Sequence, residues 1–380
     1  MVVRPLVRER PSLDREDGPP GSVLDEPPEQ LVFVHDRASG LHAGISVHST
    51  VLGPALGGCR FRPYRSRDAA IEDVTRLGRA MTAKASLAGL DLGGGKSVII
   101  GDPATDRTPA RLRAFGHLVA ELGGRYIAAE DVGTTTADMD VVRSVTPFVV
   151  GCSAAAGGAG DPSGSTASGV LAAMRAVLAF QDGGSDGDPV VGRHVVVLGV
   201  GKVGRPLATE LVAAGARVTV ADIDAGAVAE LRRSLGVGVV EVADAHRVPC
   251  DVFAPCALGG VLDATTVGAL ACRAVVGSAN NQLAEAADAD RLADRGILYA
   301  PDYLVNAGGL IHVADERSGH FDPERVAGRV AAIGTTMDAI LREADDLGIT
   351  PSAAADRIAA RRIEDALAQV QNVARSTIAS

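Results

Sequence analysis

Lysine is scarce in this chain. Of its 37 lysine and arginine residues, only three are lysines, at positions 84, 96 and 202. Arginine carries the same charge but keeps its proton in proteins, whereas a desolvated lysine can lose its proton and act as a base. Lys96 ends the run Leu92-Gly-Gly-Gly-Lys96, and we interpret it as a lysine kept for its chemistry. Lys202 lies on a loop that we expect to be exposed. There, a lysine that was by chance not replaced by arginine is the better explanation.

Aromatic residues are also few, at 3% with no tryptophan, and the formal net charge is −10. Stacking platforms for single-stranded nucleic acid need aromatic rings, and binding to a phosphate backbone needs a positive surface. We therefore expect no nucleic-acid partner. No stretch approaches the roughly 20 consecutive apolar residues of a membrane helix, so we expect no membrane partner either.

Cysteine usage excludes two further classes of protein. The chain has five cysteines and no CxxC pair, which fits neither a disulfide framework nor a zinc ribbon. The eight histidines show no HExxH or paired spacing, so no metal site is expected. We interpret the cysteines as small buried residues of a cytoplasmic protein.

Length and local pattern predict an α/β protein of two domains behind a short leader. Residues 1–30 mix Arg, Asp, Glu and Pro without an apolar core, which predicts a disordered leader rather than a secretion signal. A first domain is predicted over residues 31–150. A loop or hinge rich in Gly, Ala and Ser follows over residues 151–164. Beyond it, Val-rich strands alternate with Ala/Leu-rich helices, which indicates a parallel sheet.

The strands and helices expected along the chain place the polar residues of interest. Strands are predicted over residues 31–36, 41–49, 96–100, 125–129, 194–198, 217–221, 251–254, 274–276 and 296–299. Long helices are predicted over residues 68–88, 323–347 and 351–373. Lys84 is then near the end of a helix, and Asp131 follows a strand, where α/β folds present functional groups.

Lys84, Lys96 and Asp131 form the first candidate site. The glycines before Lys96, at 93–95, are expected to break regular structure, so the two lysines lie on consecutive elements and could meet. One ammonium would bind a substrate carboxylate, a lysine in a dry glycine-walled pocket would act as a base, and the carboxylate would exchange a proton. Taken singly, each has a fair structural alternative: a helix-end cation for Lys84, a turn residue for Lys96 and a helix cap for Asp131. Together they favour catalysis.

A dinucleotide fingerprint forms the second candidate site. Gly199-Val-Gly201-Lys-Val-Gly204 stands between a predicted strand and a predicted helix, as the motif requires. The next strand ends at Asp222, eighteen residues after the last glycine. A carboxylate there binds the ribose hydroxyls and repels a 2′-phosphate, which favours NAD as the cofactor. We expect Gly199, Gly201, Lys202, Val203, Gly204 and Asp222 to bind it.

Two asparagines, Asn280 and Asn306, are expected to follow strands of the second domain. Their amides could bind a nicotinamide carboxamide, a ribose or a substrate amine, although helix capping is the ordinary use of asparagine there. No GxSxG elbow and no P-loop is present.

Eight segments resemble the leucine, valine and phenylalanine dehydrogenases, relatives of glutamate dehydrogenase, over about residues 31–370. The segments are Leu52-Gly-Pro-Ala-Leu-Gly-Gly58, Met81-Thr-Ala-Lys84, Gly93-Gly-Gly-Lys96, Glu130-Asp-Val-Gly133, Gly199–Gly204, Ala254-Pro-Cys-Ala-Leu-Gly259, Gly277–Gln282 and Pro301-Asp-Tyr-Leu-Val-Asn306-Ala-Gly-Gly309. The resemblance implies reversible oxidative deamination, in which an L-amino acid, NAD and water give a 2-oxo acid, ammonium and NADH. It also implies a homo-oligomer. A substrate domain, 31–150 plus 345–380, and a Rossmann domain, 151–344, would flank a cleft.

The same resemblance assigns roles to residues. Lys84 binds the substrate carboxylate, Lys96 activates water, Asp131 exchanges protons with the amino group, and Asn306 holds that group. Gly57 also falls in the implied substrate site, and Thr166, Ala257 and Asn280 fall in the implied cofactor site.

The substrate side chain would contact Leu56, Ala129, Leu310 and Val313. Branched-chain enzymes tend to have Ala at the position of Ala129, and phenylalanine enzymes tend to have Leu at the position of Leu310. Because Ala129 limits depth and Leu310 adds bulk, we expect a small aliphatic substrate, valine, leucine or isoleucine. Two alternatives stay open: an aromatic substrate, phenylalanine or tryptophan, and a non-catalytic NAD-binding homologue.

Overall fold

The chain forms two compact units. The computed structural model describes residues 21–184, 187–319 and 321–378. Unit 1 consists of the described residues within Met1–Gly160, Val313–Phe321 and Arg357–Ser380, and unit 2 of those within Asp161–His312 and Asp322–Asp356. The first passage between the units thus falls at residue 160 rather than 150. A short segment around residue 317 also belongs to unit 1, which the sequence did not suggest.

The predicted leader is part of unit 1 where the structure describes it. Residues 1–20 lie outside the described residues. Beyond them Val23–Asp25 forms a short 3₁₀ helix, η1, in which Leu24 is buried. Asp25 forms an ion pair with Arg79 at 2.5 Å. The expectation of disorder is therefore wrong for this segment, because one buried leucine and one ion pair hold it on the unit.

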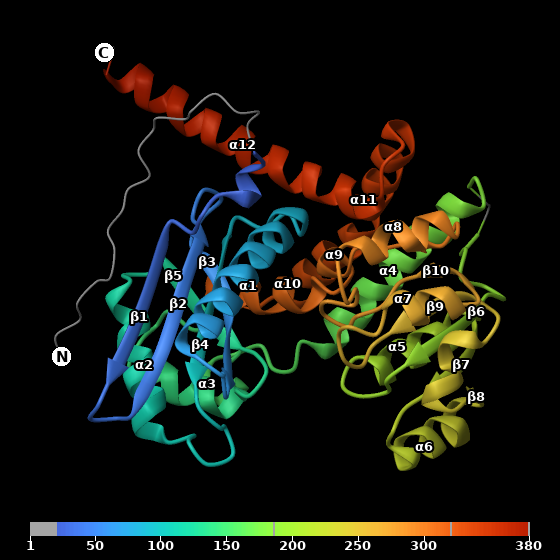
Figure 1. Ribbon diagram of the computed structural model, residues 1–380, viewed down its shortest axis with the longest axis horizontal. Helices are drawn as coiled ribbons and strands as arrows, with labels where there is room; N and C mark the ends of the chain where they lie inside the picture. The colour runs from blue at the N-terminus through green and yellow to red at the C-terminus, as the bar shows by residue number, and fades with distance from the viewer. Residues whose placement is uncertain (1–20, 185–186, 320, 379–380) are drawn as a thin grey trace. The chain divides into compact units, whose positions relative to one another are not determined.

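Unit 1 is built on a mixed five-stranded sheet of order β1-β2-β4-β3-β5. Its strands are β1 (Gln30–Asp36), β2 (Leu41–Ser49), β3 (Ala55–Arg62), β4 (Gly93–Ile100) and β5 (Tyr126–Glu130). β1 and β2 form an antiparallel hairpin, and β3, β4 and β5 are parallel. Its helices are α1 (Arg67–Leu87), α2 (Pro109–Glu121) and α3 (Thr136–Arg143). Helix α1 covers one face of the sheet, and α2 and α3 cover the other (Figure 1).

The glycine run before Lys96 does not break regular structure, as the sequence had suggested; it begins strand β4. The reason is close packing. A Cβ at Gly93 would lie 1.9 Å from the carbonyl oxygen of Ser49 on β2, and one at Gly94 would lie 2.0 Å from the backbone nitrogen of Thr82 on α1. Only glycine lets the helix backbone approach the strand this closely.

Unit 2 contains a parallel six-stranded sheet of order β11-β10-β9-β6-β7-β8. Its strands are β6 (His194–Leu198), β7 (Arg217–Ala221), β8 (Gly238–Val239), β9 (Cys250–Pro255), β10 (Cys272–Val275) and β11 (Leu298–Tyr299). This is the doubly wound order of dinucleotide-binding domains, in which the winding reverses between β6 and β9. The predicted strands are all present, with ends shifted by a few residues.

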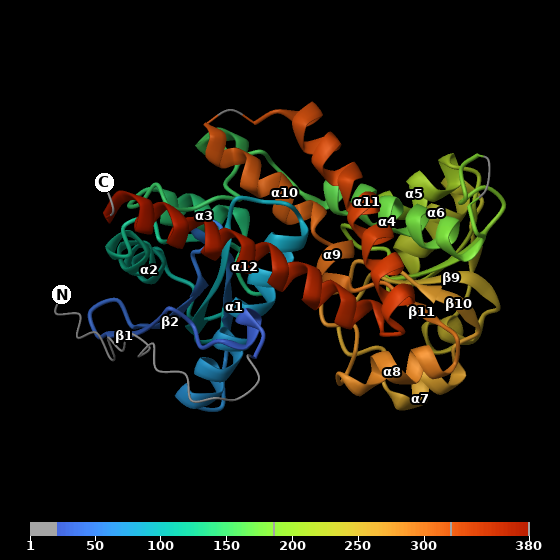
Figure 2. The ribbon, with the colours of Figure 1, turned by 90° about the horizontal axis from the view of Figure 1, so that it is seen from above.

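Helices cover both faces of this sheet (Figure 2). They include α4 (Ser163–Gln181), α5 (Gly204–Ala213) and α6 (Ala225–Leu235) on one side, and α7 (Ala264–Ala269) and α8 (Ala287–Asp294) on the other. Short helices α9 (Asp302–Val305) and α10 (Gly308–Asp315) follow, then α11 (Pro323–Leu347) and α12 (Pro351–Ile378). None of the helices in the described ranges has the length and apolar character that crossing a membrane requires.

The predicted hinge at 151–164 is only partly irregular. Ala154–Ala156 forms a 3₁₀ turn, and α4 begins at Ser163. We did not predict α4, because its Gly and Ser residues resemble a loop in sequence. In the structure Gly169 packs against α11, where an added Cβ would lie 2.8 Å from Ile333. Small residues here allow two helices to approach, rather than marking a linker.

Candidate functional site

Strand register places the candidate residues of unit 1 on one face of its sheet. Cys59 of β3 pairs with Ser97 of β4, and Gly58 pairs with Ala129 of β5. Because side chains alternate along a strand, Leu56, Gly58, Arg60, Lys96 and Ala129 share the face that α1 covers. The opposite face carries Ala55, Cys59, Phe61 and Tyr126, which belong to the hydrophobic core under α2 and α3.

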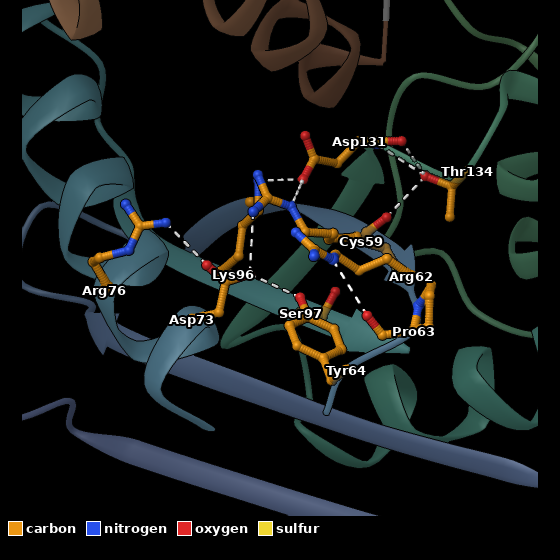
Figure 3. Close-up of polar contacts among 12 residues, drawn as sticks. Cys59, Arg62, Pro63, Tyr64, Asp73, Arg76, Lys96, Ser97, Asp131 and Thr134 are labelled. Atoms are coloured by element: carbon orange, nitrogen blue, oxygen red, sulfur yellow. Dashed lines mark hydrogen bonds and ion pairs between the residues drawn. The ribbon is translucent and has the colours of Figure 1, made fainter. Parts of the chain in front are cut away.

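Lys96 and Asp131 meet on this face. The Lys96 Nζ lies 2.9 Å from Asp131 Oδ2, and Lys96 is only 6% exposed. Asp131 follows the end of β5, as expected, and its backbone N–H donates to Thr134 Oγ1 at 2.9 Å. Thr134 in turn donates to the Cys59 carbonyl at 2.8 Å (Figure 3). These backbone contacts fix the turn that presents the carboxylate to the lysine.

Gly58 makes this ion pair possible. The two partners come from β4 and from the end of β5, with β3 between them. A Cβ at Gly58 would lie 2.7 Å from Asp131 Cβ and 2.8 Å from the Glu130 carbonyl oxygen. The missing side chain therefore leaves the room through which Lys96 reaches Asp131.

The charges around Asp131 favour its ionised form. Burial by itself would raise the pKa of Asp131, but the positive charges of Lys96 and Arg60 outweigh it, so the pKa lies below the ordinary value. Asp131 is thus a carboxylate at neutral pH, able to accept a proton.

The other predicted substrate residues divide between the units. Lys84 lies half-buried in the last turn of α1, two residues beyond Thr82, whose backbone meets Gly94 of β4. Gly57 is buried in β3 on the opposite face, and its carbonyl accepts a bond from Tyr126 at 2.6 Å. All four predicted pocket residues are buried: Leu56, Ala129 and Val313 in unit 1 and Leu310 in unit 2.

The glycines of the fingerprint in unit 2 have three different environments. Gly199 has φ +96° and lies against Ala257, whose backbone nitrogen is 2.7 Å from an added Cβ. A Cβ at Gly204 would lie 1.9 Å from the Gly199 carbonyl oxygen, whereas one at Gly201 would meet nothing within 4 Å. A tight turn, an open approach for a pyrophosphate and a close helix contact are the three needs of this motif. The loop thus fits a dinucleotide.

The neighbouring positions fit the same ligand. Val203 is the N-cap of α5, so the helix N-terminus faces this loop, and Lys202 is exposed beside it. Asp222 follows β7, where its Oδ2 accepts the Val200 N–H at 2.6 Å and its Oδ1 accepts the Asp224 N–H at 2.9 Å. The carboxylate is therefore held at the carboxyl end of the sheet, next to the glycine loop.

Asn306 presents a buried acceptor without a partner. Its Nδ2 donates to the Ser278 carbonyl at 3.2 Å and to Asn280 Oδ1 at 2.9 Å, while its Oδ1 is buried and makes no hydrogen bond. An orphaned acceptor of this kind fits a ligand N–H. Asn306 follows the short helix α9 and not a strand, which corrects our expectation. Thr166 lies in the first turns of α4, next to Gly309. A Cβ added at Gly309 would lie 2.8 Å from Thr166 Oγ1.

Sequence reasoning missed two residues of the unit 1 site, Gly58 and Arg60. Gly58 was the last residue of a quoted motif, and Arg60 stands two residues after it, between the buried Cys59 and Phe61. A charged residue between two buried apolar ones was the available signal. Among the described residues no group of histidine, cysteine and carboxylate side chains could hold a metal ion.

Two family models together cover most of the chain. Residues 28–147 match the model described as Glu/Leu/Phe/Val dehydrogenase, dimerisation domain, and residues 226–370 match glutamate/leucine/phenylalanine/valine dehydrogenase. A model of the coenzyme F420-dependent NADP oxidoreductases also matches residues 194–253, which span β6 to β9 of the parallel sheet.

Individual proteins match over nearly their whole length. A valine dehydrogenase of Streptomyces virginiae is 50% identical over 343 residues, 89% of this chain and 94% of the relative. A leucine dehydrogenase of Geobacillus stearothermophilus is 46% identical over 336 residues, 88% of this chain and 90% of the relative. The crystal structure of L-tryptophan dehydrogenase from Nostoc punctiforme superposes with a TM-score of 0.80 at 37% identity, covering 89% of this chain and 96% of that one.

Proposed function

The chain belongs to the glutamate/leucine/phenylalanine/valine dehydrogenase family of amino-acid oxidoreductases, and from that premise we propose that it deaminates a small aliphatic L-amino acid reversibly, with NAD. In the forward direction the amino acid, NAD⁺ and water give a 2-oxo acid, ammonium, NADH and a proton. The observation that carries the proposal is the ion pair between the buried Lys96 and the partly buried Asp131 on a glycine-lined strand face.

The pair supplies the two proton transfers that the reaction needs. Asp131, held as a carboxylate, accepts a proton from the substrate ammonium group so that the amine can be oxidised to an iminium ion. Lys96 accepts a proton from the water that attacks the iminium carbon. Asp131 then returns its proton to the amine of the carbinolamine. The C–N bond breaks as the carbinolamine hydroxyl proton passes to the departing ammonia, so the 2-oxo acid forms and ammonium leaves, and Lys96 releases its proton to solvent. When bound, NAD accepts the hydride from the substrate Cα.

The remaining residues bind and orient. Lys84 binds the substrate carboxylate, and Gly57 on β3 is proposed to contribute to the same substrate site. The unpartnered Oδ1 of Asn306 accepts a hydrogen bond from the substrate amino group. In the cofactor site Gly201 would leave room for the pyrophosphate and Asp222 would bind the ribose hydroxyls. Thr166 and Asn280 would help orient the nicotinamide, and Ala257, which packs against Gly199, would also contact the cofactor.

Two finer points belong to the same proposal. We infer NAD rather than NADP because Asp222 would repel a 2′-phosphate, while Arg205 is already paired with Glu230 at 2.9 Å. We infer a homo-oligomer because residues 28–147 match a dimerisation domain. A cytoplasmic location stays a prediction.

The test is NADH formation at alkaline pH from NAD and a panel of valine, leucine, isoleucine, phenylalanine, tryptophan and glutamate. Lys96→Ala is assayed beside the parent, with NADH binding measured in both. We expect turnover of the aliphatic substrates to fall at least ~10³-fold in the variant, while NADH binding to unit 2 is kept. Faster turnover of phenylalanine or tryptophan than of the aliphatic substrates would show that the enzyme is an aromatic amino-acid dehydrogenase. NAD binding without any turnover would leave a non-catalytic homologue.

A further inference from the structure

Arg60 is a partly buried arginine of unit 1 that has no role in the proposed reaction so far. Its Nε lies 3.2 Å from Asp131 Oδ2, and its Nη1 lies 3.1 Å from Asp73 Oδ2. The side chain is only 14% exposed. Arg60 extends from β3 and Asp73 from α1, so one guanidinium joins the end of β5 to the helix that carries Lys84.

The contacts continue outward as a row of alternating charges, in the order Lys96, Asp131, Arg60, Asp73 and Arg76. Figure 3 labels Lys96 and Asp131 at one end of this row and Asp73 and Arg76 at the other. The last pair joins Arg76 Nη2 to Asp73 Oδ1 at 2.9 Å, and Arg76 is 54% exposed. Tyr64 also donates its hydroxyl to Asp73 Oδ2 at 2.8 Å. The outer carboxylate is thus held by three donors, which fixes the far end of Arg60.

Asp131 therefore has two cations of different chemistry on one oxygen, Oδ2. A lysine can give up its proton, whereas an arginine keeps its proton in proteins. While Lys96 is neutral in the catalytic cycle, its positive charge is absent, and a buried carboxylate with no cation nearby would tend to become protonated. Arg60 keeps a positive charge beside Asp131 at every stage.

The other titratable groups near Asp131 in unit 1 do not supply this charge. Cys59 on β3 and Tyr126 on β5 are neutral, because burial raises the pKa of Cys59 to about 12 and that of Tyr126 well above its usual value. Charged groups on the packed elements include Glu130 on β5, Asp73, Arg76 and Lys84 on α1, and Asp138 on α3. The cations that lower the pKa of Asp131 most are Lys96 and Arg60. Burial would lower the pKa of Arg60, but Asp131 and Asp73 outweigh it and raise that pKa.

We propose that Arg60 is a positioning residue, which holds Asp131 in place as a carboxylate while Lys96 cycles between its charged and neutral forms. The fork of the guanidinium matters as well as its charge, since a single ammonium cannot bind two carboxylates from these two directions at once. The inference rests on the proposed function, because it takes Asp131 and Lys96 to be the groups that move protons.

The test compares Arg60→Gln and Arg60→Lys with the control Arg62→Gln. Arg62 lies two residues further along β3, is exposed, and contacts the Pro63 carbonyl and the Tyr64 ring rather than a carboxylate. The control removes the same charge from the same strand. The full chain is used, and each variant is first checked for its thermal midpoint and for NADH binding.

In Arg60→Gln we expect kcat/KM to fall ~10²-fold and the acidic limb of its pH profile to move up by about one pH unit. The sign follows because Asp131 must be ionised, and losing a neighbouring positive charge raises its pKa. Arg60→Lys should keep the limb near that of the parent but recover little of kcat. Arg62→Gln should match the parent in both. Equal profiles for Arg60→Gln and Arg62→Gln would overturn the proposal.

A second measurement does not depend on turnover. The carboxyl carbon of Asp131 is titrated by ¹³C NMR in the unliganded protein and assigned with Asp131→Asn. Arg60→Gln should raise the pKa of that carboxyl relative to Arg62→Gln, and an unchanged pKa would overturn the proposal. A parent that turns over no amino acid would defeat the proposed function alone, because the titration still decides whether Arg60 controls Asp131.

Discussion

The two candidate sites are built from different materials. In unit 1 the polar groups are side chains on neighbouring strands, buried under α1 and bound to one another through ion pairs. In unit 2 they are mainly backbone groups of an exposed loop at the carboxyl end of a parallel sheet, with one carboxylate beside them. The site of unit 1 depends on the charges of interacting side chains, whereas the site of unit 2 depends on the conformation of a backbone loop.

This difference teaches where each site is sensitive. A loop that binds its ligand through backbone groups tolerates substitutions whose side chains point into solvent. It loses its conformation when an added side chain clashes with the turn. When one partner of a buried charge network is replaced by a neutral residue, the other charge is left uncompensated, which lowers stability and shifts the protonation of the groups that stay. The substitutions below test this contrast in order of decreasing effect.

The largest effect is expected in the loop of unit 2. Gly204→Ala would place a Cβ 1.9 Å from the Gly199 carbonyl oxygen, whereas Gly201→Ala would place one in open space. We expect the first to destabilise folding by about 3 kcal/mol or more and the second by less than about 1 kcal/mol. Gly201→Ala should nevertheless weaken NADH binding, since its methyl group occupies the space for the pyrophosphate. Urea unfolding and NADH fluorescence separate the two, and equal stabilities would contradict the assignment of the glycines.

The next largest effect is expected in the strand face of unit 1. Gly58→Ala would push against Asp131 Cβ and the Glu130 carbonyl oxygen, so Lys96 and Asp131 would separate. We expect kcat/KM to fall ~10²- to 10³-fold while NADH binding is unchanged. The control is Gly164→Ala, because a Cβ added at Gly164 would meet nothing within 4 Å, and this variant should behave as the parent does. Gly89→Ala would not serve, because Gly89 has φ +66°, a conformation that strains alanine.

Asp222 tests the side-chain part of the cofactor site. Asp222→Asn should raise the KM for NAD about 10-fold and narrow the preference over NADP, because the neutral amide no longer repels a 2′-phosphate. Asp224→Asn removes the same charge two residues away, where Asp224 caps α6. It should leave the cofactor preference as it was. If both variants lose the preference for NAD over NADP equally, the negative charge of this region sets the preference and not the carboxylate of Asp222 itself.

Ala129 tests the depth of the substrate pocket. Ala129→Gly should raise the ratio of phenylalanine to valine turnover by about 10-fold, within the range that one methylene group commands in such pockets. Steady-state kcat/KM for both substrates measures it. Val313→Ala is tested in the same way, since Val313 is also buried in unit 1. If the ratio of phenylalanine to valine turnover rises in neither variant, these residues do not line the substrate pocket.

The smallest effect is expected at the outer end of the charge row. Burial would raise the pKa of Asp73, but the Tyr64 hydroxyl and the charges of Arg60 and Arg76 outweigh it and lower that pKa. A lowered carboxyl pKa stabilises the fold above the unfolded-state value, and this contribution is lost as the pH falls through the folded-state pKa. Asp73→Asn should therefore cost about 1 kcal/mol at pH 7 and less near pH 3. Urea unfolding at both pH values measures it, with the exposed Glu72→Gln as control.

The contrast between the sites also explains what could be read from the sequence. The fingerprint of unit 2 lies within six consecutive residues, and the strand before it and the acid after it could be recognised from local pattern alone. That the sheet is parallel could also be predicted, whereas its strand order is known only from the structure. Lys96 and Asp131 could be singled out, but their contact depends on β3 lying between β4 and β5.

Local pattern was least informative where glycine served packing. Gly93–Gly95 and the first turns of α4 resemble loops, because glycine's absence from helices and strands is a statistical tendency that a close neighbour overrides. Arg60 escaped notice for a related reason. Its partners, Asp73 and Asp131, are 13 and 71 residues away in the chain, so only the folded register reveals them.

The scarcity of lysine has a practical consequence. A protease specific for lysine has three sites in this chain, after residues 84, 96 and 202. The first lies within α1 and the second is 6% exposed in β4, whereas Lys202 is exposed on the glycine loop. Cleavage of the folded protein should therefore begin at Lys202. A dinucleotide bound over that loop would shield it, so the rate at which one band becomes two would report how much of the enzyme holds its coenzyme.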